Sequence, residues 1–187
     1  MKYQNKTQLL VTVLLPFFVL NSAQASQGQI TFNGLVTAST CTVSVDGQGG
    51  DSIITLPTVD AANLANAADT AGRTTFSIEL SGCTMSTSPA DTQVTAFFES
   101  GPNVDFATGR LNNSGVATNV QLQILDGNQS VITVGDSSQL TDNYYQTIAG
   151  TSGTGTATLN YSVEYYATGQ STAGTVSSSV VYSMNYK

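Results

Sequence analysis

The residues of this sequence that could do chemistry are mainly aspartates, tyrosines and two cysteines, because histidine is absent. Without histidine the chain lacks the usual general base of nucleophilic triads and the commonest nitrogen ligand of zinc. Paired carboxylates such as Asp46 with Asp51, or Asp136 with Asp142, could in principle serve a glycoside hydrolase. Their glycine and polar neighbours favour turns instead, where aspartate makes local hydrogen bonds. We therefore interpret them as solvated turn residues.

The other chemical motifs are weak. Gly153-Thr154-Gly155 is too short for a phosphate-binding loop, and no Gly-Lys-Ser/Thr follows it. The pairs Tyr144-Tyr145 and Tyr165-Tyr166 could line a sugar site, although tyrosines of cores and strand surfaces are commoner. The sequence thus predicts no catalytic site, no metal site and no cofactor, and we expect that the protein is not an enzyme.

The composition favours one folded, β-rich domain. The chain has 187 residues, 40% of them hydrophobic, which suffices for a core of ordinary size. Eight Tyr and seven Phe, together with many Val, Thr and Ser, are typical of strands. Five Lys and Arg residues against twelve Asp and Glu give a net charge of −7. This balance argues against a nucleic-acid partner, because phosphates are bound by basic surfaces.

The N-terminus has the pattern of a secretory signal peptide, residues 1–25. Lys2 and Lys6 precede an apolar run at 9–20, and the small-residue pattern Ala23-Gln24-Ala25 follows it. The run is shorter than the roughly 20 residues of a membrane span, so an uncleaved anchor is the less favoured alternative. We expect the remainder of the chain to be exported.

Both cysteines, Cys41 and Cys83, lie in the exported part. An even number of cysteines in an oxidising compartment favours a single disulfide. A metal site is the alternative, but two thiols without histidine make a poor zinc set. A disulfide between them would close a loop of 43 residues. In the chain-entropy model, closing such a loop stabilises a protein by roughly 4 kcal/mol.

Most segments of the exported part alternate polar and apolar residues with period two, as half-buried strands do. A short helical turn is predicted at 60–68, where Ala, Asn and Leu replace the alternation. Together with one disulfide between strands, this pattern predicts a β-sandwich of immunoglobulin type. The alternating runs are at 30–36, 41–45, 76–80, 94–98, 120–124, 157–165 and 176–186.

The first and last of these runs lie at the two ends of the exported part. On pattern alone they could be the first and last strands of one closed sandwich. Alternatively, the N-terminal strand could belong to a neighbour's sheet, as in donor-strand complementation.

The order and spacing of several stretches resemble the chaperone–usher pilins, most closely the major subunits of type 1 fimbriae. The resemblance covers nearly all of the exported part, and it includes Gly174, which is fourteenth from the C-terminus. The matching stretches are ITFNGLV ahead of Cys41, FSIELSGC ending at Cys83, ATNVQLQILDG at 117–127, YYATG at 165–169, and the terminal SVVYSMNYK with its penultimate Tyr186.

The resemblance implies an all-β, incomplete immunoglobulin-like sandwich that lacks its seventh strand and is completed by a donor strand from another chain. Residues 26–37 would form the N-terminal donor-strand extension and residues 38–187 the pilin domain. The donor residues would be Gly28, Ile30, Phe32, Gly34 and Val36. The edge of the groove that receives a donor strand would carry Gly174, Val176, Val180, Tyr182, Met184 and Tyr186.

The same resemblance implies a function and a location. The chain would be a structural subunit of a surface fimbria (pilus), a homopolymer that serves cell adhesion. A periplasmic chaperone would deliver it to an outer-membrane usher, where donor-strand exchange joins it to neighbouring subunits, and host glycans are a further expected partner. The alternative is a minor or adaptor pilin, or a single-domain carbohydrate-binding adhesin of the same fimbria.

Overall fold

The computed structural model describes residues 40–85, 92–141 and 144–187. These residues form nine strands and two short 3-10 helices, η1 (Ala61–Leu64) and η2 (Ser137–Leu140), and η1 lies within the predicted helical turn. In this part of the chain no helix is long and apolar enough to cross a membrane. The strands are β1 (Thr40–Val45), β2 (Thr70–Thr84), β3 (Gln93–Phe98), β4 (Val104–Asp105), β5 (Arg110–Asn112), β6 (Val120–Leu125), β7 (Gln146–Thr147), β8 (Gly155–Ala167) and β9 (Tyr182–Tyr186).

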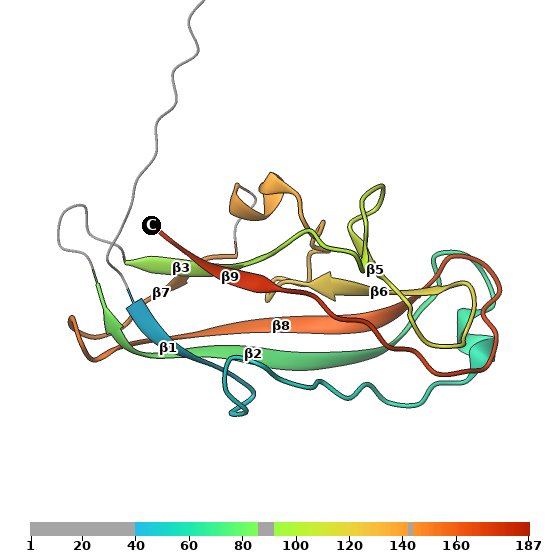
Figure 1. The fold of residues 1–187 in the computed structure, drawn as a ribbon, viewed down its shortest axis with the longest axis horizontal. Coiled ribbons are helices and arrows are strands. Elements are labelled where there is room, and N and C mark those ends of the chain that lie inside the picture. Colours follow the sequence, from blue (N-terminus) through green and yellow to red (C-terminus); the bar gives the residue numbers. More distant parts are fainter. Residues whose placement is uncertain (1–39, 86–91, 142–143) are drawn as a thin grey trace, which may run out of the picture. The chain divides into compact units, whose positions relative to one another are not determined.

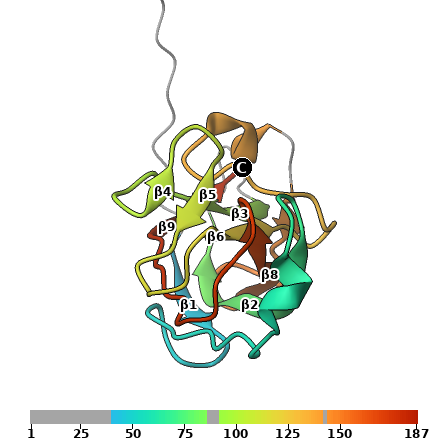
Figure 2. The same ribbon diagram turned by 90° about the vertical axis from the view of Figure 1, so that its right-hand side faces the viewer.

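The strands form two sheets (Figure 1). The larger has six strands in the order β1-β2-β8-β6-β5-β4, and the smaller has three in the order β7-β3-β9. In the end view of Figure 2, the larger sheet curls from β1 and β2 at the lower edge through β8 to β5 and β4 at the upper edge. The side chains on its inner face therefore meet those of β3 and β9.

The long antiparallel pair of β2 and β8 forms the centre of the larger sheet. Their alternating sequences put one set of side chains into the core, so that Ile78, Leu80 and Leu159 are at most 2% exposed. The intervening Glu79 and Thr158 are exposed on the other face. In these stretches of β2 and β8 the alternation in the sequence predicts correctly which face is buried.

Tyr161 of β8 is at the centre of the core, with 1% of its surface exposed. Its ring packs against Phe76, Phe98 and Tyr144 with centroid distances of 5.8, 5.1 and 5.5 Å. Its hydroxyl accepts a hydrogen bond of 3.1 Å from the amide of Ala96 in β3. The buried phenol, whose pKa is raised by its burial, therefore joins the two sheets through both its ring and its oxygen.

The predicted disulfide between Cys41 and Cys83 is present. It connects the start of β1 to the end of β2, and Cys83 is completely buried. The 42-residue separation means that the bond closes a loop containing β1, η1 and nearly all of β2.

A polar network covers part of the outer face of the larger sheet. Although Glu164 lies on the face that the alternation assigns to solvent, it is only 2% exposed. Arg73 Nε donates to its carboxylate at 2.8 Å, and Gln123 donates to its second oxygen. Arg110 stacks over the ring of Tyr166 at 3.6 Å beside them. Long side chains from neighbouring strands thus bury the carboxylate, which a period-two pattern cannot predict.

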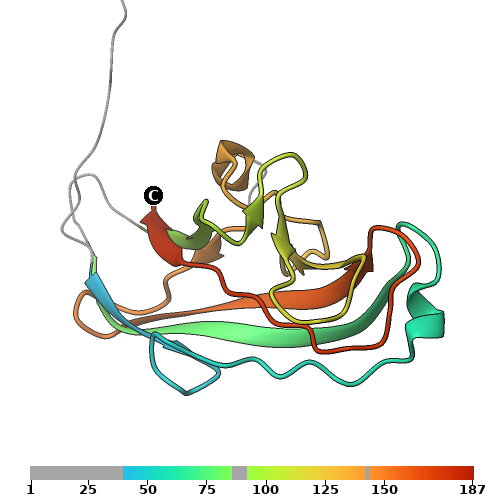
Figure 3. The ribbon, with the colours of Figure 1, turned by 45° about the vertical axis from the view of Figure 1, so that its right-hand side comes forward.

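The last strand is shorter than the sequence predicts. The alternation extends over 176–186, but the strand β9 begins only at Tyr182. Before it, the carbonyls of Thr175 and Ser177 accept hydrogen bonds from the amides of Ala117 and Ser114. This stretch therefore pairs with a loop rather than with a strand. In Figure 3 it is the red segment that leads from the end near η1 towards β9.

Candidate interaction groove

Two sheet edges lie open on the same side of the sandwich. Within the described residues, β1 pairs only with β2 and β9 pairs only with β3. The two edge strands run in opposite directions, with the start of β1 and the end of β9 on the left of Figure 1. Both edges carry unpaired backbone donors and acceptors, which is the arrangement that an added strand can satisfy.

An apolar groove of about 710 Å³ lies between these edges. Its floor consists of buried side chains of the core, among them Ile78, Phe98 and Ile124. One wall is formed by Val43 and Val45 and the segment 50–56, and the other by the segment 178–184. Seven extended residues span about 20 Å, so each of these wall segments has the length of a whole strand.

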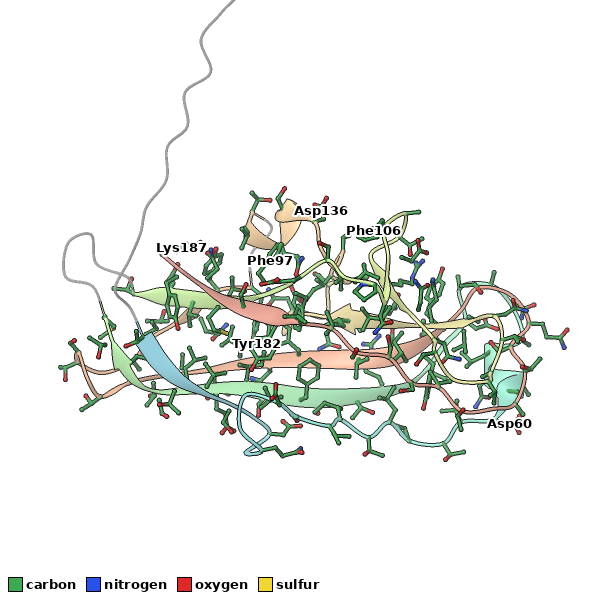
Figure 4. The ribbon with its side chains drawn as sticks, viewed as in Figure 1. Asp60, Phe97, Phe106, Asp136, Tyr182 and Lys187 are labelled. Atoms are coloured by element: carbon green, nitrogen blue, oxygen red, sulfur yellow. A yellow bond between two sulfur atoms is a disulfide. The ribbon has the colours of Figure 1, made fainter. Side chains whose placement is uncertain are left out.

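A hydrogen bond joins the two walls of the groove. Tyr182 of β9 points across it, and its hydroxyl donates to the carbonyl of Gly50 at 2.8 Å. Figure 4 labels Tyr182 at the side of β9 that faces β1 and β2. Burial, followed by the charge of Asp51, raises the pKa of Tyr182. The phenol therefore stays protonated and able to donate at neutral pH.

The predicted edge residues fall into two groups. Val180, Tyr182 and Met184 line the groove, and Tyr186 packs, half-buried, against the core at the end of β9. Gly174 and Val176 instead line a second hollow of about 400 Å³ near η1. Val176 packs against both hydrophobic clusters of the core. The five predicted donor residues lie outside the described residues, and their role stays a prediction.

Gly174 has a local structural reason to be glycine. A Cβ atom at this position would lie 2.6 Å from the amide nitrogen of Ala117, in the loop that pairs with the chain ahead of β9. We expect Gly174→Ala to destabilise the subunit by about 1–3 kcal/mol, because the backbone would have to separate. The measurement is the urea midpoint of unfolding.

Gly101→Ala is the matched control for this substitution, because a Cβ there would meet no atom within 4 Å. An equal midpoint for the two variants would contradict the proposed close approach.

The opposite wall of the groove is not predicted from the sequence. Ser52, Ile54 and Leu56 follow β1 in an extended segment and line the groove. Their period-two spacing is the available signal, but the exposed Ile53 interrupts it. No ladder hydrogen bonds define this segment as a strand, so alternation alone was too weak to identify it.

Two of the candidate carboxylates, Asp46 and Asp136, make the local hydrogen bonds of turn and cap residues. Asp46 Oδ1 accepts hydrogen bonds from the amide and hydroxyl of Ser77. Asp136 caps η2, and its hydrogen bonds with Ser138 lower the pKa of its carboxyl group. Asp142 lies outside the described residues. In the described ranges, no group of three or more His, Cys, Asp or Glu side chains could hold a metal ion.

The tyrosine pairs also have structural partners. Tyr144 packs on Tyr161, Tyr145 donates to Asn185 in β9, Tyr165 donates to the carbonyl of Pro57, and Tyr166 lies under Arg110. Each of the four tyrosines therefore has a contact of its own within the described part of the chain. The groove is therefore the feature on which we base a functional assignment.

The two curled sheets and the groove between open edges define an incomplete immunoglobulin-like sandwich. The fold is similar to that of a chain in the structure of a chaperone-usher pilus, with a TM-score of 0.59, 21% identity and coverage of 87% of this chain and 96% of that one. It is also similar to the crystal structure of the P pilus rod subunit PapA, with a TM-score of 0.57, 18% identity and coverage of 79% and 99%.

The sequence comparisons assign the family. Residues 56–187 match the family FimA, type-1 fimbrial protein, A. The chain is 45% identical over 149 residues to the major fimbrial subunit SMF-1 of Stenotrophomonas maltophilia (strain K279a), covering 76% of this chain and 82% of that protein. It is 37% identical over 159 residues to the F17 fimbrial protein of Escherichia coli, with coverage of 74% and 87%.

The chain therefore belongs to the type-1 fimbrial protein family, and it is a structural subunit of a fimbria. The family is one of surface pilus components and is not known as an enzyme family. This confirms the resemblance seen in the sequence, and it supports the structural pilin over the alternative of a minor pilin or single-domain adhesin.

Proposed function

We propose that this subunit polymerises by donor-strand exchange, in which residues 26–37 of one copy fill the groove of the next. The observation that carries the proposal is the apolar groove between the open edges of β1 and β9. A strand placed there would pair with both edges and cover the apolar floor at the same time.

The N-terminal extension has a sequence suited to this groove. Ile30, Phe32 and Val36 share one face of an extended segment, and the opposite face carries Thr31 and Asn33 together with the apolar Leu35. Each such side chain contributes about 1.5–3 kcal/mol when it is fully buried. The donor segment and the groove are different surfaces of one molecule, so the contact is heterologous and growth can continue without closure.

The same groove explains the proposed route to the surface. An exposed apolar groove with two unpaired edges is prone to aggregation, so a subunit released by its signal peptide (residues 1–25) would need a temporary strand. We propose that a periplasmic chaperone supplies this strand and that an outer-membrane usher exchanges it for the next subunit's extension. In this role the chain catalyses no reaction, and its binding to host glycans stays a prediction from the resemblance.

Two valines test the groove. Val180 lines it and is half-buried against the core, whereas Val116 lies in a loop outside it and is 73% exposed. We expect Val180→Asp to abolish acceptance of a donor strand, because the carboxylate would be desolvated in the filled groove. The expected result is loss of the detergent-resistant ladder that assembled subunits give on a gel without boiling.

Val116→Asp is the matched control and should keep the ladder. If Val180→Asp assembled as well as Val116→Asp, the groove would not be the site of subunit joining.

A further inference from the structure

A single side chain connects the two walls of the groove. The hydroxyl of Tyr182, the first residue of β9, donates to the carbonyl of Gly50 at 2.8 Å, and both residues line the groove. The ring of Tyr182 is half-buried and packs against the core. It therefore lies across the gap between the walls and covers part of the apolar floor.

The carbonyl of Gly50 is part of the edge that an added strand would use. It points into the groove, because it accepts a hydrogen bond from the opposite wall. A strand that joins a sheet pairs with the backbone groups of the edge that face it. Gly50 begins the wall segment 50–56, so the hydroxyl of Tyr182 occupies an acceptor that an entering strand also needs.

We propose that the hydrogen bond between Tyr182 and Gly50 is a latch, which closes the groove of a single subunit and must open before a strand can enter. This inference rests on the proposed donor-strand exchange. The hydroxyl and the entering strand compete for one carbonyl, and the ring and the strand's side chains compete for the same part of the floor. Because the latch must break before the strand's own hydrogen bonds form, it slows entry.

A latch of this kind protects an open edge against the wrong partners. Unpaired edge groups readily pair with strands of other chains, which leads to aggregation. A short or poorly matched segment gains too few hydrogen bonds to replace the one that it must break. A strand that pairs along the whole wall replaces the latch with a ladder of hydrogen bonds, so the latch favours long, well-matched strands.

The rate at which a strand enters the groove tests the latch. The exported chain, kept dilute so that it stays monomeric, is mixed with a fluorescent synthetic peptide of residues 26–37. Tyr182→Phe should take up the peptide roughly five-fold faster than the unchanged chain, because the ring is kept but the hydrogen bond that must break is absent. The rate at which the bound peptide leaves should stay unchanged, because the latch is already open in the filled groove.

Tyr145→Phe is the matched control for the latch. The hydroxyl of Tyr145 also donates to a neighbour, Asn185 of β9, at 2.9 Å, but Tyr145 does not line the groove, so uptake should not change. Equal uptake by Tyr182→Phe and Tyr145→Phe would overturn the latch. Faster release from Tyr182→Phe would overturn it too, since the hydroxyl would then bind the seated strand. Uptake that persists in Val180→Asp, or no uptake by any of these chains, would instead contradict donor-strand exchange through this groove.

Discussion

A subunit without residues 26–36 is expected to receive a strand from a neighbour but to donate none, so that each such subunit ends a filament. The groove consists of residues from Val43 onwards, so the deletion leaves it unchanged. The deletion removes the apolar positions Ile30, Phe32 and Val36, which the proposal assigns to the neighbour's groove. Co-expressed with the unchanged chain, the deleted subunit should shorten the filaments in proportion to its share.

Complementation with a groove variant makes this experiment specific. Val180→Asp should donate without receiving, and the deleted subunit should receive without donating. Each expressed alone should give only monomers bound to chaperone, and the two together should give a heterodimer that resists detergent without boiling and grows no further. Long filaments from the deleted subunit alone would show that these residues are not the donor.

The second large effect is expected from removal of the disulfide. Cys41→Ala together with Cys83→Ala should destabilise the subunit by about 4 kcal/mol in the chain-entropy model. The two cysteines are 42 residues apart in sequence, so without the bond the unfolded chain regains the conformational entropy of a long loop. This is a large share of the stability of a domain of this size. The measurement is the urea midpoint of the assembled filament, with the reduced, unchanged filament as the reference.

Chemical reduction of the disulfide provides the control for the double cysteine variant. Reduction of the unchanged filament should lower its midpoint to that of the double variant, and reduction of the variant should have no effect. A variant as stable as the oxidised filament would show that the bond adds nothing to the folded subunit.

The sequence predicts most of this fold because the strands are half-buried. In β2 and β8, Ile78 and Leu159 are buried while Glu79 and Thr158 are exposed. The alternation of apolar and polar residues in the sequence predicts this burial directly. The short strands β4, β5 and β7 have two or three residues each, too few for any period. Glu164 is buried by side chains from neighbouring strands, and no local pattern contains that information.

The groove is predicted only on one side. Val180, Tyr182 and Met184 alternate in the sequence and line the wall beside β9, and their role in receiving a donor strand stays a prediction. Ile54 and Leu56 form the opposite wall without pairing to a strand, so their sequence carries a weaker signal. Gly174 was assigned to the edge of the groove from the resemblance, but its close approach to Ala117 is a tertiary contact that only the structure reveals.

The position of the disulfide has a mechanical consequence for a filament whose subunits are joined through their N-terminal extensions. Pulling on such a filament would load the chain just ahead of β1, in which Cys41 is the second residue. The covalent bond transfers this tension directly to Cys83, at the end of the long strand β2. The β2–β8 ladder would then be loaded in shear along its length, and the loop from 41 to 83 could not lengthen under force while the bond is intact.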